Sequence, residues 1–192
     1  MQPTRTFQTP PGSSPELVPR ASAPIYVCSL ELMPQLVVET RARHLITVIN
    51  KMSIPPTPAV VPAEAHLRLA MNDITGPQDG LVHPNEAHIA ALIAFARDWA
   101  RQGPLVVHCW AGISRSTAAA FIALCTLNAP GAERRFAQAL RAASPTATPN
   151  VLMVELADDL LGAKGRMIDA IAEIGVGEMA MAGKSFKMAS HL

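Results

Sequence analysis

Residues 106–116, VVHCWAGISRS, bring together the side chains of this sequence that are best suited to chemistry. Cys109 offers a thiol, and Arg115 offers a planar guanidinium whose donors match two phosphate oxygens. A serine on each side of the arginine adds a hydroxyl, and Gly112 lets the backbone approach a ligand or adopt a positive φ. These residue types indicate a nucleophile beside a site for an oxyanion.

The elements on either side of this stretch decide whether the thiol can react. Residues 104–109 are predicted to form a buried strand, and residues 116–128 a helix that is apolar on nearly every side and therefore central. Residues 109–115 would then wrap around the start of the helix, where inward-pointing amides and the helix dipole favour an anion and a thiolate. The spacing predicts an oxyanion cradle with Cys109 at its base.

Predicted strands and helices alternate through the rest of the chain. The further strands are expected at 24–30, 44–50 and 66–73, and the further helices at 31–43, 83–104, 131–144, 148–162 and 163–175. This order predicts an α/β fold: a central, mainly parallel twisted sheet of about four to five strands flanked by helices. The cradle would lie between a central strand and a buried helix.

Composition divides the chain into three parts. Residues 1–24 are rich in proline and are predicted to form a disordered lead-in. Residues 25–174 are predicted to form one folded domain, which suits a chain of 192 residues with 49% hydrophobic side chains. Residues 175–192, rich in methionine and alanine, are expected to be a flexible tail.

Charge and cysteine usage narrow the class of protein. A net charge of +1 favours neither nucleic acid nor a membrane surface as a partner. The amino terminus does not have a signal-peptide profile, and no apolar run approaches the roughly 18 residues of a membrane span, so we expect a cytoplasmic protein. The spacing of Cys28, Cys109 and Cys125 fits neither a zinc site nor a disulfide framework, so we expect reduced thiols, no metal and no cofactor. The oligomeric state stays open.

Residues 108–116, HCWAGISRS, resemble the HCxxGxxR[ST] signature of the cysteine-based protein tyrosine phosphatases, and most closely their small dual-specificity branch. The resemblance extends from about Ile25 to Leu161 and implies that residues 25–174 are a phosphatase domain. It also implies a substrate that is a phosphorylated protein or a small phosphomonoester. In proteins, that substrate would be phosphotyrosine, with phosphoserine and phosphothreonine left open.

The same resemblance assigns roles to the residues of the motif. Cys109 would attack phosphorus to give a phosphocysteine, and Arg115 with the loop amides would hold the equatorial oxygens. Ser116 would hydrogen-bond to the thiolate and assist its departure, while His108 would brace the loop. The implied substrate-binding residues are Trp110, Ala111, Gly112, Ile113, Ser114 and Arg115. The variable loop positions carry neither lysine nor arginine, which favours a substrate with a single phosphate over a polyphosphorylated inositol.

A phosphate ester also needs a proton donor for its leaving group. The family takes it from an aspartic acid that follows a strand upstream, and here Asp73 lies 36 residues before Cys109 (109 − 73). Asp79 is the alternative, but its Gln-Asp-Gly setting is typical of a simple turn. The resemblance therefore favours Asp73 as the general acid.

Two other classes of function fit part of the pattern. A rhodanese-type sulfurtransferase also places a cysteine in an amide-lined loop at a helix start, but it needs no aspartic acid facing that loop. A non-catalytic phosphate-binding module would need the cradle but not the thiol. Cys125 is expected to be core packing, and so is Cys28, although some relatives use a second cysteine to trap the oxidised nucleophile.

Overall fold

The computed structural model of the chain describes residues 22–191, so all but the last three residues of the predicted lead-in lie outside the described part. The strands are β1 (Ile25–Ser29), β2 (His44–Ile49), β3 (His66–Ala70), β4 (Leu105–Cys109) and β5 (Phe186–Met188). The helices are α1 (Met33–Glu39), α2 (Glu86–Trp99), α3 (Arg115–Leu127), α4 (Glu133–Ala143), α5 (Val151–Leu161) and α6 (Arg166–Ile174), with two short 3-10 helices at Lys51–Ser53 and Ala63–Ala65. Within the described residues, no helix combines the length and apolar character needed to cross a bilayer.

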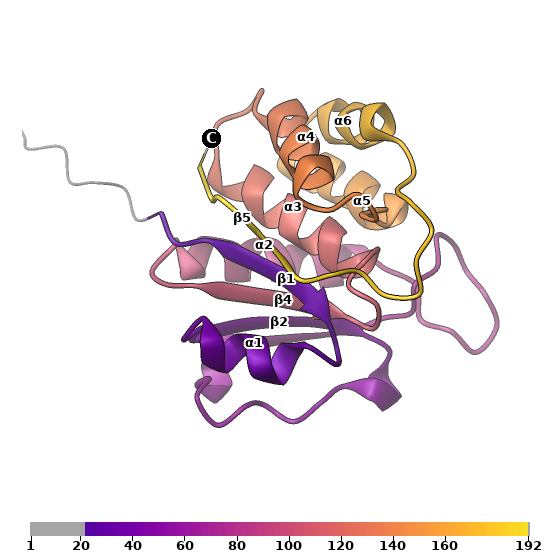
Figure 1. Cartoon of the computed structure of the whole chain (residues 1–192). Helices are drawn as coiled ribbons and strands as arrows, with labels where there is room; N and C mark the ends of the chain where they lie inside the picture. The colour runs from indigo at the N-terminus through magenta and orange to yellow at the C-terminus, as the bar shows by residue number, and fades with distance from the viewer. Residues whose placement is uncertain (1–21, 192) are drawn as a thin grey trace, which may run out of the picture.

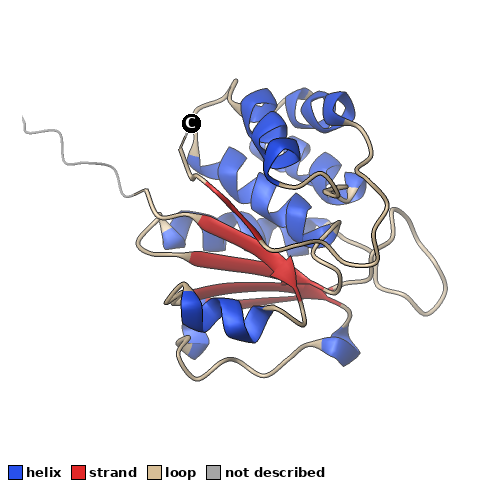
Figure 2. Cartoon of the chain, viewed as in Figure 1, coloured by secondary structure: helices blue, strands red, loops and turns tan. Residues whose placement is uncertain are grey.

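The five strands form a single sheet in the order β3-β2-β4-β1-β5 (Figure 2). Strands β1 to β4 are parallel, and β5 pairs antiparallel with β1. The predicted α/β fold with a mainly parallel sheet is therefore confirmed. Every residue of β4 is buried, because helices cover both faces of this central strand.

Side chains along the strands alternate between two hydrophobic clusters on opposite faces of the sheet. Val107 and Ile46 belong to the larger cluster, which also includes residues of α2 to α6. Val106 and Leu45 belong to the smaller cluster, which is closed by α1. Figure 1 shows α1 on one face of the sheet and α2 to α6 on the other. The turn from β4 into α3 is consequently anchored at both ends in buried structure.

Helix α3 begins at Arg115, one residue before the predicted start, and is the helix most deeply buried against the sheet. All ten residues from Arg115 to Leu124 are buried. The hydroxyl of Thr117 donates to the carbonyl of Ile113 at 2.6 Å and contacts the carbonyl of Ser114 at 2.8 Å. These bonds tie the first turn of α3 to the segment that precedes it.

Strand β5 is a finding of the structure, because the sequence pattern suggested only a tail after residue 174. The prediction of a tail without regular structure is wrong for residues 186–188, which add an antiparallel edge strand to β1. Met188 is buried in the larger cluster. The carbonyl of Ser190 accepts hydrogen bonds from the side chains of Arg101 and Asn128. These contacts hold the segment in place. Its alternation of apolar and polar residues is too short to predict a strand from the sequence.

Candidate active site

The 109–115 loop turns from the last residue of β4 to the first residue of α3, as the sequence predicts. Gly112 makes this turn possible, since its φ is +75°. A Cβ at this position would lie 2.8 Å from the backbone carbon of Cys28 and 2.8 Å from the backbone nitrogen of Ser29. The loop therefore packs directly against the end of β1 at a position that only glycine fits.

The thiol of Cys109 lies at the base of this loop and is 1% exposed. Its Sγ is 3.1 Å from the hydroxyl oxygen of Ser116, and the amide of Gly112 donates to it at 3.2 Å. The Gly112 amide and the start of α3 direct partial positive charge at the sulfur, which is the setting in which cysteine thiolates act as nucleophiles. The predicted pair of Cys109 and Ser116 is thus brought together.

The guanidinium of Arg115 is buried beside the loop and is held by a backbone carbonyl outside the loop. Its Nη1 donates to the carbonyl of Met71 at 2.8 Å. Its Nε is buried without a hydrogen-bond partner, although it lies 3.5 Å from Oδ2 of Asp73. A buried donor of this kind is uncommon and is available to an oxygen of a bound anion.

Asp73 reaches the loop from the segment between β3 and α2. Its Oδ1 accepts from the hydroxyl of Ser114 at 2.7 Å and from the side-chain amide of Asn150 at 2.9 Å. Its side chain is 35% exposed, so the carboxylate lies at the mouth of the loop and within reach of solvent. Asp79, the alternative, is exposed on a turn where Gly80 has a φ of +75°.

Asn150 belongs to the site, and the sequence reasoning missed it. Its Oδ1 accepts from the amide of Met153 at 3.1 Å and so caps α5, while its Nδ2 donates to Asp73. The Thr-Pro-Asn run of residues 148–150 was a recognisable helix start. Helix capping is a sufficient reason for an asparagine at this position, so nothing in the sequence indicated the bond from Asn150 to Asp73.

Two segments far along the chain brace the loop through backbone hydrogen bonds. The amide of Thr148 donates to the carbonyl of Ile113 at 3.0 Å, and the amide of Gly183 donates to the carbonyl of Ala111 at 2.8 Å. The amide of Gly177 donates to the hydroxyl of Thr148 at 3.0 Å and links the two segments. The carbonyls of Ala111 and Ile113 therefore face protein partners, while the amide of Gly112 faces the thiol.

His108 is fully buried on the opposite side of β4 from the helices α2 to α6. Its Nε2 is 2.7 Å from the hydroxyl oxygen of Thr47, and its Nδ1 is 3.4 Å from the carbonyl oxygen of Cys109. Burial lowers the pKa of its imidazole to about 4, so the ring is neutral at neutral pH. It touches the backbone of the nucleophile but is not placed to exchange protons with a substrate.

Trp110 points into solvent, with 59% of its surface exposed. It is therefore not a core anchor, and its side chain lies on the surface beside the loop. Together with Leu30, Glu31 and Met181 it lines a hollow of about 230 Å³ next to the loop. Met181 is almost fully exposed, so the wall of this hollow is adaptable.

The other two cysteines have environments that suppress reactivity. Burial raises the pKa of the Cys28 thiol to about 12, with a smaller contribution from Cys109 nearby. Burial also raises the pKa of Cys125, and the carboxylates of Glu133 and Asp158 add to this effect. Both are free thiols: Cys28 is buried in the core, and Cys125 is partly buried against it.

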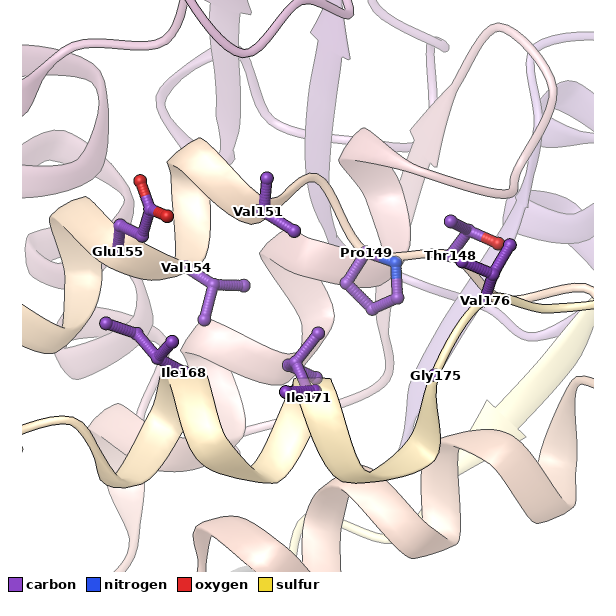
Figure 3. Close-up of a pocket in the computed structure, with 10 residues that line it drawn as sticks. Thr148, Pro149, Val151, Val154, Glu155, Ile168, Ile171, Gly175 and Val176 are labelled. Carbon is purple, nitrogen blue, oxygen red and sulfur yellow. The ribbon is translucent and has the colours of Figure 1, made fainter.

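An apolar hollow of about 300 Å³ lies between α5 and α6, and Figure 3 shows Val154, Ile168 and Ile171 around it. Glu155 is the one ionisable side chain among its lining residues. The hollow therefore has neither a cysteine nor an anion-binding group, in contrast to the 109–115 loop. Across the described residues, no cluster of three or more His, Cys, Asp or Glu side chains could hold a metal ion.

Comparisons with known proteins are consistent with this geometry. Residues 70–141 match the sequence profile of a family described as protein-tyrosine phosphatase, so the match includes Asp73, the 109–115 loop and α3. A search of curated proteins finds no match.

Solved structures resemble the chain over most of its length. The structure of DUSP15 covers 85% of this chain and 97% of its own, with 21% identity and a TM-score of 0.57. Human DUSP28 covers 73% of this chain and 94% of its own, with 20% identity and a TM-score of 0.56. PTPMT1 in complex with PI(5)P covers 78% and 93%, with 19% identity and a TM-score of 0.54. At these identities the similarity establishes the fold.

Proposed function

We propose that the chain is a cysteine-based protein tyrosine phosphatase that hydrolyses phosphate monoesters through a phosphocysteine. The match of residues 70–141 to the protein-tyrosine phosphatase profile and the fold shared with DUSP15 and DUSP28 support this proposal. One observation carries the proposal. The thiol of Cys109, with Ser116 and the Gly112 amide against it, shares a loop with the buried guanidinium of Arg115, and Asp73 lies over that loop.

In the first step the thiolate of Cys109 attacks phosphorus, an S–P bond forms and the bond from phosphorus to the ester oxygen breaks. The leaving oxygen takes a proton from the carboxylic acid of Asp73. Arg115 and the inward amides of the loop stabilise the charge on the equatorial oxygens. The contact between Arg115 and the Met71 carbonyl supports this role, because it orients the guanidinium before substrate arrives.

In the second step water attacks the phosphocysteine. The carboxylate of Asp73 accepts a proton from the water, the S–P bond breaks, and inorganic phosphate leaves with Cys109 restored as a thiolate. Ser116 supports this step, because its hydroxyl is 3.1 Å from the sulfur and can stabilise the departing thiolate.

We propose phosphotyrosine in proteins as the main substrate, with phosphoserine and phosphothreonine to be tested beside it. Within the loop Arg115 is the one cation, which suits a single phosphate. The PTPMT1 structure contains PI(5)P, which makes a phosphoinositide the second substrate class to test. The exposed Trp110 and the adaptable Met181 beside the loop support a tolerant site for the rest of the substrate.

The test is hydrolysis of p-nitrophenyl phosphate and of an alkyl phosphate, each with EDTA present. We expect Cys109→Ser to abolish turnover, while the matched variant Cys125→Ser keeps it. Asp73→Asn should slow the alkyl phosphate by about 100-fold or more and p-nitrophenyl phosphate by less, because nitrophenolate leaves without a proton. Asp79→Asn is the control for this change and should match the wild type on both substrates.

Two results would contradict the proposal. Thiosulfate:cyanide sulfurtransferase activity that survives Asp73→Asn would assign the loop to sulfur transfer. Phosphopeptide binding without turnover, unchanged by Cys109→Ser, would assign it to recognition alone.

A further inference from the structure

A row of hydrogen bonds crosses three strands on the α1 face of the sheet and ends at the nucleophile's backbone. The hydroxyl of Thr47 on β2 lies between two imidazoles, 2.7 Å from Nε2 of His108 and 2.8 Å from Nε2 of His66. The Nδ1 of His66 is 2.9 Å from the hydroxyl of Thr57, which also accepts from the guanidinium of Arg68. Strand register explains the row, since Thr47 pairs directly with His108.

Chemistry fixes the direction of this row at its inner end. The carbonyl oxygen of Cys109 can only accept, so Nδ1 of His108 carries the proton. The ring is neutral, so its Nε2 is bare and must accept from Thr47. A hydroxyl has one proton, and the oxygen of Thr47 therefore accepts from Nε2 of His66.

The outer end gives the same direction. Burial lowers the pKa of His66 to about 4, with Arg68 and His108 adding to the shift, so this ring is neutral as well. With its proton on Nε2, its Nδ1 is bare and accepts from Thr57. A guanidinium can only donate, and Arg68 accordingly donates to Thr57. One orientation satisfies every group from the surface to the loop.

We propose that Thr47, His66, Thr57 and Arg68 are positioning residues for Cys109, joined in a single directed chain of hydrogen bonds that runs from the Arg68 cation to the Cys109 carbonyl. The proposal rests on the proposed function, since that function makes Cys109 the nucleophile that these residues position. It gives a positioning role to four side chains that lie outside the loop and its flanking motif.

The chain acts on the loop through the peptide between Cys109 and Trp110. Each donated bond makes the next donor stronger, so the bond from His108 to the carbonyl is stronger with the row intact than without it. Fixing the carbonyl fixes the plane of the peptide and hence the amide of Trp110, which points the opposite way. Removing one hydrogen bond of the row therefore makes the Trp110 amide, the first amide after the nucleophile, less rigidly oriented.

The first measurement is the imidazole tautomers, from long-range ¹H–¹⁵N correlation spectra of the full chain with signals assigned by single His→Gln variants. We expect His108 as the Nδ1–H tautomer and His66 as the Nε2–H tautomer. In Thr47→Val the Nε2–H of His66 loses its acceptor, and we expect its proton to move to Nδ1, where Thr57 can accept. In Thr47→Ser the hydroxyl is kept and both tautomers stay. The opposite tautomer at either ring of the wild type overturns the proposal.

The second measurement is alkylation of Cys109 by iodoacetamide near pH 6, followed by mass spectrometry of its peptide. We expect Thr47→Val to slow alkylation by about tenfold, because the thiolate is the nucleophile and a loosened loop amide stabilises it less, and Thr47→Ser to restore the wild-type rate. Thr126→Val is the matched control, because its hydroxyl bonds to the Ile122 carbonyl on α3, away from this row. An unchanged rate in Thr47→Val, or an equal fall in Thr126→Val, overturns the proposal.

Neither measurement requires turnover, so the two hypotheses fail separately. Hydrolysis through Cys109 with the wrong tautomers overturns the directed chain and leaves the phosphatase standing. The expected tautomers and alkylation rates in a chain that hydrolyses no phosphate ester support the directed chain and overturn the phosphatase.

Discussion

Asp73 lies over the loop because three partners from two segments hold it there. Ser114 and Asn150 donate to one carboxylate oxygen, and Arg115 lies beside the other. Of these three, Asn150 is the partner outside the loop motif. Its Oδ1 caps helix α5 and its Nδ2 donates to the acid, and a substitution can separate these two roles.

Asn150→Ser keeps a capping oxygen at the start of α5 but removes the amide that donates to Asp73. Serine caps helices about as well as asparagine, so we expect the free energy of unfolding to change by less than about 0.5 kcal/mol. The kcat/KM for an alkyl phosphate should fall by about tenfold, because the acid loses one of its positioning contacts. Asn85→Ser makes the same change at the cap of α2, whose side chain accepts from His88, and should leave kcat/KM unchanged. Equal losses in both variants would contradict this role.

Gly112 and Gly80 share a φ of +75° but differ in their surroundings. Alanine at either position adds about 1–2 kcal/mol of left-handed strain. At Gly112 the new Cβ would also meet the backbone of β1 at 2.8 Å, whereas at Gly80 it meets nothing within 4 Å. We expect Gly112→Ala to lower turnover by about 100-fold, because the loop must move, and Gly80→Ala to keep turnover. Steady-state kinetics with urea unfolding of both variants would measure this.

At the scale of elements, helix α6 takes its amino-terminal cap from another helix. Asp158 of α5 is buried, and its carboxylate accepts from the amides of Gly165 at 2.6 Å and Met167 at 2.9 Å. The residue before α6 is a glycine in the left-handed region and offers no capping side chain. The α5–α6 turn therefore depends on one carboxylate for the unpaired amides of a helix start.

Asp158→Ala should lower the free energy of unfolding by about 2–3 kcal/mol, because it leaves two amides of the α6 start without their acceptor. Its neighbour Asp159 is exposed, and Asp159→Ala should change stability by less than about 0.5 kcal/mol. Urea unfolding followed by circular dichroism compares the two. Similar stability losses in both variants would show that charge, and not the cap, is responsible.

The elements that the sequence could predict are those with a strong local signal. Periodicity and caps locate α2 and α3, and the residue types of the 109–115 loop predict its place between β4 and α3. The contacts of Asn150 and Thr47 had no such signal, because a helix cap and a β-branched strand residue are complete explanations of those residues on their own. Strand β5 is three residues long and depends on its partner β1, so no local pattern could reveal it.

At the scale of the whole molecule, buried neutral histidines link stability to pH. Burial lowers the pKa of His66 and His108 from 6.5 to about 4, and it lowers the pKa of His44 and His88 in the same direction. Between about pH 6.5 and 4 the unfolded chain therefore binds protons that the folded chain does not. The contribution of these histidines to the free energy of unfolding is therefore constant above about pH 6.5 and becomes less favourable as the pH falls toward 4.

We expect the free energy of unfolding to fall, below about pH 6.5, by up to about 1.4 kcal/mol per pH unit for each of His66 and His108. Urea unfolding of the full chain at a series of pH values between about 7 and 5 measures the slope. His66→Gln should reduce that slope by about one proton, since glutamine does not titrate in this range. A slope identical in the wild type and this variant would contradict the assignment.

The bracing of the loop from the far end of the chain has a consequence for synthesis on the ribosome. Gly183, which donates to the Ala111 carbonyl, follows Cys109 by 74 residues (183 − 109). At about 5–20 residues per second this partner is added about 4–15 s after the nucleophile. During that interval the nascent chain carries the 109–115 loop without the contact from Gly183 to Ala111 and without β5 on the sheet edge. A stalled or prematurely terminated chain is therefore a product without a finished active site.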